Sequence, residues 1–286
     1  IWAGLFIEGK LIAEGAEGNL ITFTSNESAP ELGDWNTIMF EASSDDTSII
    51  RYSKIEYATY GIWCDNSSPT ISNNIITNIM KKGIYLYQSN ALITDNVISN
   101  ITYQFASTRG IEAEESNLTI IGNTITNITN YGIKLGKDSS STIIDNDISH
   151  AIDGINMMQS APTVYNNTIT NNSNGIVVID SSSPNITYNV IANNTNAGVM
   201  VSQSSPAISD NDLAGNKYGI LLFDLSNINI GDSTFAYNDY DVYCDNSTAI
   251  VVTNSQIGNS AQLELSLSKS TLTTVNTTFS GKVYVS

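Results

Sequence analysis

The chain has 286 residues, of which 41% are hydrophobic, a composition that supports a real core and is not that of a disordered tail. Lys and Arg total 11 against 28 Asp and Glu, so the net charge of −17 and the lack of a basic stripe make nucleic acid a poor partner. No apolar run approaches the ~18 residues of a membrane span, and two cysteines without a CxxC motif exclude a thiolate metal site and a disulfide framework.

Residues 1–60 are predicted to form the N-terminal coils of a β-solenoid. The short apolar segments within 7–15 and 20–25 together make one coil, and a second coil begins at residues 34–40. The polar stretch between them, residues 26–34, is predicted to protrude from the solenoid as a loop.

Residues 61–257 repeat a short pattern with a period of 21 to 27 residues. Each repeat opens on a glycine followed by a β-branched residue, and the pairs are Gly61-Ile62, Gly83-Ile84, Gly110-Ile111, Gly132-Ile133, Gly154-Ile155, Gly175-Ile176, Gly198-Val199 and Gly219-Ile220. About ten residues later comes an apolar-x-x-Asn-x-apolar phrase, as at residues 71–76 and 143–148. The period is too short for paired helices, and the strict alternation of Ile, Val and Thr predicts two or three short parallel strands per repeat.

One asparagine column is predicted to form a ladder along the solenoid. Its members are Asn74, Asn96, Asn123, Asn146, Asn167, Asn189 and Asn211, with Ser53, Ser233 and Ser255 in the same register. Asparagine tolerates tight corners, and stacked amides can bond between coils at the ~4.8 Å strand spacing. The glycine column is explained in a similar way, by a corner that needs positive φ or a close backbone approach.

Residues 258–286 are predicted to form the C-terminal coils. The whole chain, 1–286, is therefore expected to be one all-β domain, a single-stranded parallel β-helix of about ten coils with an asparagine ladder. Right-handed winding is the strong rule for parallel strands joined by crossovers, so a right-handed solenoid is predicted.

The repeat resembles a known group of proteins. The Gly9–Gly15 phrase, Asp34-Trp35 and the serial Gly-Ile and Ser-Ser-Pro-x-Ile-x-x-Asn-x-Ile repeats are similar to NosD-like, carbohydrate-binding and sugar-hydrolase type right-handed β-helix proteins of bacterial and archaeal cell surfaces. That group includes polysaccharide lyases, hydrolases, epimerases and non-enzymatic envelope proteins. The resemblance therefore implies the fold and an extracellular or cell-surface location, and leaves the activity open.

An aromatic and acidic constellation is predicted on outward positions of residues 85–134. It consists of Tyr85, Tyr87, Arg109, Glu112, Glu114 and Lys134. Aromatic rings stack on sugars, whereas Glu112, Glu114 and Lys134 are the weak candidates for acid–base chemistry and the two acids could bind calcium. The alternative is a solvated, charge-paired face, and the net charge of −17 is expected to repel an anionic polymer.

The second half of the same outward columns is apolar. Its residues are Met158, Val177, Ile179, Met200, Leu221 and Phe223. Monomeric proteins rarely leave such a strip bare, so it is predicted to be an assembly surface covered by a neighbouring subunit. The alternative is that the register slips and these side chains point inward.

The two cysteines, Cys64 and Cys244, lie about eight coils apart, which is too far for a disulfide within one chain. Both are expected to be buried, and whether they pair between chains is left open. Asn-x-Ser/Thr sequons, many of which arise by chance in so Asn- and Thr-rich a chain, occur at Asn26, Asn66, Asn100, Asn117, Asn127, Asn166, Asn171, Asn185, Asn193, Asn246 and Asn276.

Two classes of function remain. The favoured one is a non-catalytic extracellular or cell-surface β-helix with a structural, self-assembling or glycan-contact role, and no cofactor except, at most, calcium. The alternative is a carbohydrate-binding module or a polysaccharide-active enzyme, a lyase or glycoside hydrolase, that uses the face around residues 85–134.

Overall fold

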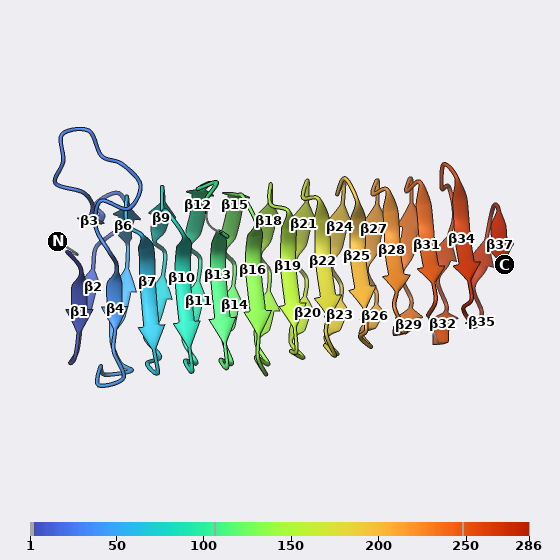
Figure 1. Cartoon of the computed structure of the whole chain (residues 1–286), viewed down its shortest axis with the longest axis horizontal. Helices are drawn as coiled ribbons and strands as arrows, with labels where there is room; N and C mark the ends of the chain where they lie inside the picture. Colours follow the sequence, from blue (N-terminus) through green and yellow to red (C-terminus); the bar gives the residue numbers. More distant parts are fainter. Residues whose placement is uncertain (1–2, 106, 248, 286) are drawn as a thin grey trace.

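The computed structural model describes residues 3–105, 107–247 and 249–285, and the chain winds into an all-β solenoid of three parallel sheets (Figure 1). Sheet 1 has 13 strands: β1 (Leu5–Ile7), β4 (Ile38–Phe40), β7 (Tyr60–Asp65), β10 (Lys82–Tyr87), β13 (Arg109–Glu114), β16 (Tyr131–Gly136), β19 (Asp153–Met158), β22 (Asn174–Ile179), β25 (Ala197–Ser202), β28 (Tyr218–Phe223), β31 (Tyr240–Asp245), β34 (Leu263–Ser268) and β37 (Val283–Val285).

Sheet 2 has 12 strands: β2 (Ile12–Glu14), β5 (Ile49–Arg51), β8 (Thr70–Ser72), β11 (Leu92–Thr94), β14 (Thr119–Ile121), β17 (Thr142–Ile144), β20 (Thr163–Tyr165), β23 (Asn185–Thr187), β26 (Ala207–Ser209), β29 (Asn227–Gly231), β32 (Ala249–Thr253) and β35 (Leu272–Val275). Sheet 3 also has 12: β3 (Ile21–Phe23), β6 (Ser53–Glu56), β9 (Ile75–Thr77), β12 (Val97–Ile101), β15 (Thr124–Ile128), β18 (Asp147–Ser149), β21 (Thr168–Thr170), β24 (Val190–Ala192), β27 (Asp212–Ala214), β30 (Thr234–Ala236), β33 (Gln256–Ile257) and β36 (Thr278–Phe279).

Each strand pairs in parallel with the equivalent strand one coil further on, so every coil contributes one strand to each sheet. The fold class predicted from the repeat, a right-handed parallel β-helix, is confirmed, with about twelve coils. Within the described ranges no helix has the length and hydrophobicity needed to cross a membrane.

The core is a set of stacked columns of inward side chains. In one coil it receives Ile84 and Leu86 from sheet 1, Ile93 from sheet 2 and Ile98 from sheet 3, and all four are fully buried. Because successive side chains of a strand point to opposite faces, the alternating sequence delivers isoleucine inward and polar residues outward. Each coil therefore covers the apolar surface of the next.

The predicted asparagine ladder is present at the corner between sheets 2 and 3. The Asn74 backbone N–H and side-chain Nδ2 both donate to Oδ1 of Asn96 at 3.0 Å, and the pattern repeats from coil to coil to Asn211. Serines continue the column at its C-terminal end, where Asn211 N donates to Ser233 Oγ at 3.2 Å. The ladder satisfies backbone groups that each corner would otherwise bury without partners.

A second asparagine ladder, not predicted from the sequence, lies at the corner between sheets 3 and 1. It consists of Asn172, Asn194, Asn216 and Asn238, each with its side-chain oxygen accepting from the preceding coil. All four residues are buried. Both corners of sheet 3 in the C-terminal half are thus fixed by amide columns.

The glycine column is explained by close approach rather than by positive φ. A Cβ atom at Gly83 would lie 2.6 Å from the carbonyl oxygen of Gly110 and 2.8 Å from Cγ2 of Ile98, so the backbone turns inward there without room for a side chain. Gly83 and Ile84 therefore both face the interior, and Lys82, just before them, faces outward. This irregularity adds an extra outward column to sheet 1.

Two local features complete the fold. The chain between β3 and β4 leaves the solenoid as a loop (Figure 1), anchored where Nε1 of Trp35 donates to the carbonyl oxygen of Glu56 at 2.8 Å.

Cys64 and Cys244 are free and fully buried, as expected, and burial raises the pKa of both thiols. Neither sulfur can reach a second chain while the fold is intact.

Candidate functional site

The outward face of sheet 1 carries three columns of side chains that run along the solenoid. In β10 these columns hold Lys82, Tyr85 and Tyr87, which pair with Arg109, Glu112 and Glu114 of β13. In β16 the equivalent positions are Tyr131, Lys134 and Gly136. The pairing therefore places all six predicted site residues on one face of three successive coils.

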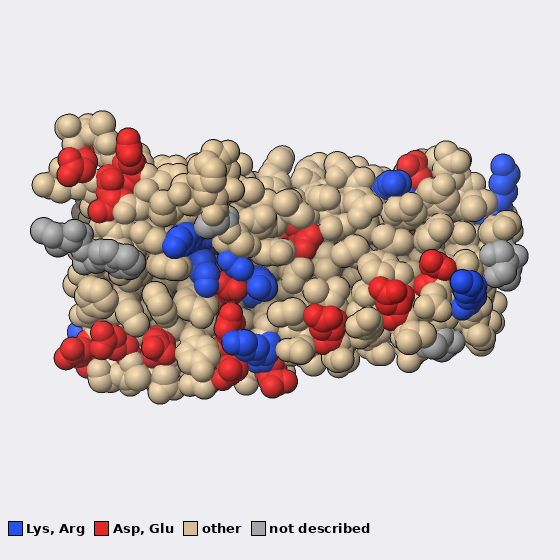
Figure 2. Space-filling view, viewed as in Figure 1, with Lys and Arg blue, Asp and Glu red and all other residues tan. Residues whose placement is uncertain are grey.

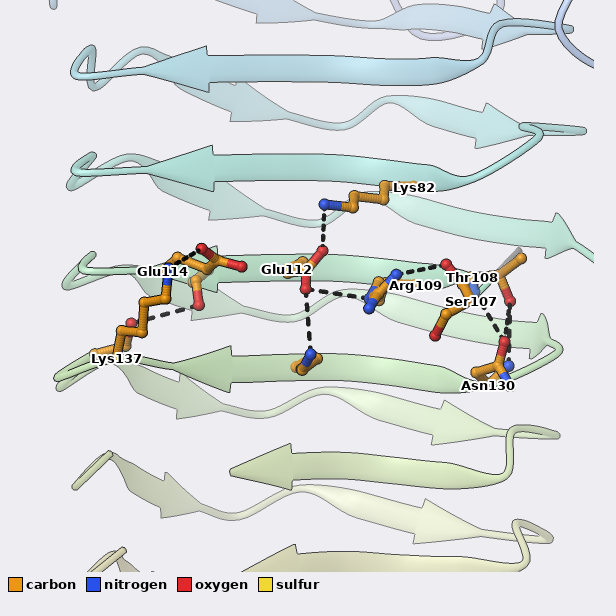
Figure 3. A network of polar contacts seen from close by, with 11 residues as sticks. Lys82, Ser107, Thr108, Arg109, Glu112, Glu114, Asn130 and Lys137 are labelled. Atoms are coloured by element: carbon orange, nitrogen blue, oxygen red, sulfur yellow. Dashed lines mark hydrogen bonds and ion pairs between the residues drawn. The ribbon is translucent and has the colours of Figure 1, made fainter. Parts of the chain in front are cut away.

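Glu112 is the centre of this face (Figure 3). Its carboxylate is 2% exposed and contacts three cations: Lys82 Nζ at 2.5 Å, Arg109 Nε at 3.1 Å and Lys134 Nζ at 3.5 Å. The cationic side chains are only 15 to 21% exposed. A nearly buried carboxylate can be tolerated here because three positive charges from adjacent strands surround it.

The local charge of this cluster is positive, in contrast to the chain as a whole. Lys82, Arg109 and Lys134 contact the single carboxylate of Glu112, whereas Glu114 on the same face is paired with its own cation, Lys137. Figure 2 shows a group of Lys and Arg atoms on the N-terminal half of the visible face, with Asp and Glu atoms beside it, and separate Lys and Arg atoms near the C-terminal end. The expectation that the net charge repels an anionic polymer stays a prediction, which this local excess of positive charge opposes.

Aromatic rings border the cluster on its N-terminal side. The centroids of Tyr60 and Trp63 lie 5.3 Å apart, as do those of Trp63 and Tyr85. Lys82 Nζ lies 3.5 Å from the centroid of the Tyr85 ring, within the range of a strong cation–π contact. Tyr131 lies on the opposite side of the cluster, 5.7 Å from both Arg109 Cζ and Lys134 Nζ.

Burial shifts the titration of three groups on this face. It lowers the pKa of Lys82, although the hydrogen bond and charge of Glu112 act in the opposite direction. Burial also raises the pKa of Tyr85 to about 12, with the charges of Glu114 and Glu112 adding to the effect. In the next coil burial raises the pKa of Asp153, although hydrogen bonds from Asn174 and Asn156 oppose that shift.

The remaining predicted residues lie at the margin of the cluster. Glu114 contacts Lys137 Nζ at 3.1 Å in a more exposed ion pair, and Tyr87 precedes Glu114 in the same outer column. Among the described residues, no group of three or more His, Cys, Asp or Glu side chains is placed to hold a metal ion. Calcium binding by Glu112 and Glu114 stays a prediction.

Several contributors were missed from the sequence. Lys82, Tyr60, Tyr131 and Asp153 all occupy the column immediately before the repeat glycine. Strict alternation from the following isoleucine would place that column inside, and only the inward turn at the glycine places it outside. The regular Lys-Gly-Ile, Arg-Gly-Ile and Tyr-Gly-Ile spacing was the available signal.

The predicted apolar strip continues this face over β19 to β28. Pairing joins Val177 to Met200 and Met200 to Leu221, while their sequence neighbours Val178, Val201 and Leu222 fill the core. The alternative of a slipped register is therefore wrong. Val177 is 2% exposed and the other five members, Met158, Ile179, Met200, Leu221 and Phe223, are half-buried, so the coils themselves cover much of the strip.

Comparison with known proteins gives one family and a set of related folds. The sequence model of the family described as "Right handed beta helix region" matches residues 60–213, 109–257 and 174–284. The periplasmic alginate epimerase AlgG is similar with a TM-score of 0.58 and 13% identity, over 96% of this chain and 76% of that one.

A second solved structure, tailspike protein 2 from Escherichia coli O157:H7 bacteriophage CAB120, has a TM-score of 0.52 and 11% identity, over 93% of this chain and 41% of that one. A search of curated proteins finds no significant match. At such identities the likeness concerns the fold alone.

Proposed function

Since this chain belongs to the right-handed β-helix family, we propose that it is an extracellular protein that binds an acidic polysaccharide, without cleaving it, on the outward face of sheet 1. The contact surface is the part of that face over β7 to β16. The single observation that carries the proposal is the convergence of Lys82, Arg109 and Lys134 on Glu112 beside a row of aromatic rings.

The cations supply the charge for an acidic ligand. A lysine ammonium has three N–H donors and arginine has five, whereas Lys82, Arg109 and Lys134 each make one contact with Glu112. Donors therefore remain that can face a carboxylate or sulfate group arriving from solvent. Because the side chains are already held by Glu112, binding costs little further side-chain entropy.

The aromatic rings supply a surface for the sugar itself. Tyr60, Trp63 and Tyr85 follow one another across β7 and β10, and their faces and edges can pack against the apolar side of a pyranose ring. Successive coils repeat at the ~4.8 Å strand spacing, which is comparable to the rise of one sugar in an extended polysaccharide. An extended chain that runs along the solenoid axis can therefore meet equivalent positions on successive coils.

The state of Glu112 favours binding over catalysis. Its two oxygens are engaged by three cations, so the carboxylate is not free to take a proton from a substrate or to attack a sugar carbon. Glu114 is similarly paired with Lys137. Of the two acids predicted as weak catalytic candidates, Glu112 thus holds the cations in place, and Glu114 forms a more exposed ion pair at the margin.

A lyase is the second candidate function, and Lys82 is the observation that favours it. Burial lowers the pKa of Lys82, which enlarges the fraction of neutral amine that can abstract a proton beside a uronate carboxyl group. Incubation with acidic polysaccharides would then produce unsaturated sugar ends, detected by ultraviolet absorbance. If no polymer yields such ends while binding is observed, the lyase is refuted.

The binding proposal is tested with a matched pair of charge-neutralising variants. Lys134→Gln removes a cation of the cluster, and Lys217→Gln removes a lysine that lies 5.0 Å from the ring of Tyr218, on another coil. Affinity electrophoresis in gels containing alginate or other acidic polymers should show Lys134→Gln weakened about fivefold, because one partly exposed charge contributes ~1 kcal/mol. Equal retardation of both variants and the wild type would refute the assigned surface.

A further inference from the structure

We propose that the exposed sequon asparagines of this protein carry N-linked glycans, which cover the corners of the solenoid and leave the outward face of sheet 1 bare. The modification itself does not rest on the polysaccharide ligand proposed above. Only its consequence, a face kept open for contact, is linked to that function.

All sequon asparagines are exposed, and no buried asparagine among the described residues begins a sequon. Every one of the eleven sequon asparagines is exposed: Asn26, Asn66, Asn100, Asn117, Asn127, Asn166, Asn171, Asn185, Asn193, Asn246 and Asn276. Among the described residues the buried asparagines are Asn74, Asn96, Asn123, Asn146, Asn156, Asn167, Asn172, Asn174, Asn189, Asn194, Asn211, Asn216 and Asn238, and none of them begins a sequon. The acceptor amides are therefore all accessible in the folded solenoid.

The strand pleat explains part of this separation. A ladder residue such as Asn146 is followed two positions later by the core residue Ile148, whereas the exposed Asn166 is followed by the exposed Thr168. Residues two apart share a face, so an exposed asparagine brings its hydroxyl partner to the surface with it. Both groups that define a sequon are thus presented together.

Backbone geometry concentrates these asparagines at the corners. Eight of them have positive φ, between 49° and 58°: Asn66, Asn100, Asn127, Asn166, Asn171, Asn193, Asn246 and Asn276. Residues with this conformation project from tight turns, where an attached sugar meets the least steric hindrance. Asn66 and Asn246 follow strands of sheet 1, Asn166 and Asn276 follow strands of sheet 2, and Asn171 and Asn193 follow strands of sheet 3. Asn100 and Asn127 are the next-to-last residues of β12 and β15 in sheet 3.

The outward face of sheet 1 is different. Within the described parts of its strands no residue is a sequon asparagine, and the two asparagines in its outward columns, Asn156 and Asn174, are nearly buried and hydrogen-bonded to Asp153. The cationic cluster and the apolar strip share this face. Glycans at the corners would therefore cover the turns of the solenoid and leave the cationic cluster and the apolar strip exposed.

The modification is a group transfer from a lipid-pyrophosphate-linked oligosaccharide. The side-chain Nδ2 of asparagine forms a bond to the anomeric carbon of the first sugar, and the bond from that carbon to the pyrophosphate oxygen breaks. The pyrophosphate leaves with the electron pair of that bond, and one amide proton is released. The transfer needs no oxidant or reductant.

Glycopeptide mass spectrometry of the protein purified from its own cells tests the modification directly. We expect sugar masses on several corner asparagines, for example Asn166 and Asn193, and unmodified ladder peptides that contain Asn146 or Asn211. Thr168→Ala should abolish the mass on Asn166 without altering the others. Unmodified asparagine at every sequon would overturn the proposal.

A designed sequon tests whether the face must stay bare. Met158→Asn places a sequon on the outward face of sheet 1, because Gln159 and Ser160 follow it, whereas Met158→Gln is of similar size and creates none. Expressed in the same cells, the glycosylated Met158→Asn protein is expected to lose binding to acidic polysaccharide, and Met158→Gln is expected to retain it. Undiminished binding by glycosylated Met158→Asn would overturn the inference that the face must stay bare. If the wild-type protein itself does not bind acidic polysaccharide, the proposed function is refuted instead.

Discussion

Replacing Glu112 by glutamine removes the negative charge on which three cations converge. The carboxylate is 2% exposed, and Lys82, Arg109 and Lys134 lie 2.5 to 3.5 Å from its oxygens. Glutamine has nearly the same shape, so packing is retained while three positive charges lose their common partner. The loss is therefore electrostatic in origin.

The magnitude follows from burial. Removing one member of a fully buried ion pair costs roughly 3 to 5 kcal/mol, because a desolvated charge is left uncompensated. The three cations retain 15 to 21% of their side-chain exposure, so water compensates part of this loss and the expected cost is about 2 to 3 kcal/mol. Raising the ionic strength should reduce the cost, since salt screens the remaining repulsion.

Chemical denaturation followed by circular dichroism measures this cost. Glu114→Gln is the matched control, because its pair with Lys137 is exposed and should contribute less than ~1 kcal/mol. We expect a lower midpoint for Glu112→Gln at an unchanged denaturant dependence. If the two variants were equally stable, Glu112 would not be the electrostatic centre of the cluster and the reasoning would be wrong.

Three further outcomes are expected. Asn146→Ala removes donors to the carbonyl oxygens of Ile120 and Ile144 and should lower the free energy of unfolding by about 3 kcal/mol. Asn229→Ala, at an exposed strand position without positive φ, should change it by less than ~0.5 kcal/mol in the same denaturation assay. Burial raises the pKa of Asp153, so the folded protein binds the carboxyl proton more tightly than the unfolded chain does. The free energy of unfolding should therefore fall as the pH rises from the ordinary carboxyl pKa through the raised pKa of the folded state. A pH series of denaturation curves should show that Asp153→Asn flattens this decline. Mass photometry over a concentration series is expected to show self-association that Phe223→Ser weakens, and a monomeric wild type at every concentration would remove the role proposed for the apolar strip.

The fold could be predicted almost completely because every coil repeats the same physical solution. Isoleucine at alternate positions of each strand defines the inward face. Asn146 and Asn167, one coil apart, make equivalent hydrogen bonds to the next asparagine of the ladder. The second ladder, from Asn172 to Asn238, was missed because it covers only part of the chain and lies beside exposed asparagines of the same type. Sequence alone does not say which of two adjacent asparagines faces inward.

The candidate site was predicted only in part. The columns after each glycine gave Tyr85, Glu112 and Lys134. The column before the glycine was not found, because strict alternation would place Lys82 inside and only the inward turn at Gly83 places it outside. The net charge also gave no indication of the cationic cluster. A sum over the whole chain cannot register that basic residues from three separate repeats meet around a single carboxylate.

The most direct test of the account is a calorimetric titration of the wild-type protein with an acidic polysaccharide and with the same polymer after chemical reduction of its carboxyl groups. The two ligands share their backbone and differ only in charge. We expect binding of the acidic form that weakens with added salt, and little binding of the reduced form. Equal affinity for both polymers, or no binding of acidic polymers, would contradict the claim that the cationic face of sheet 1 is a polysaccharide-binding surface.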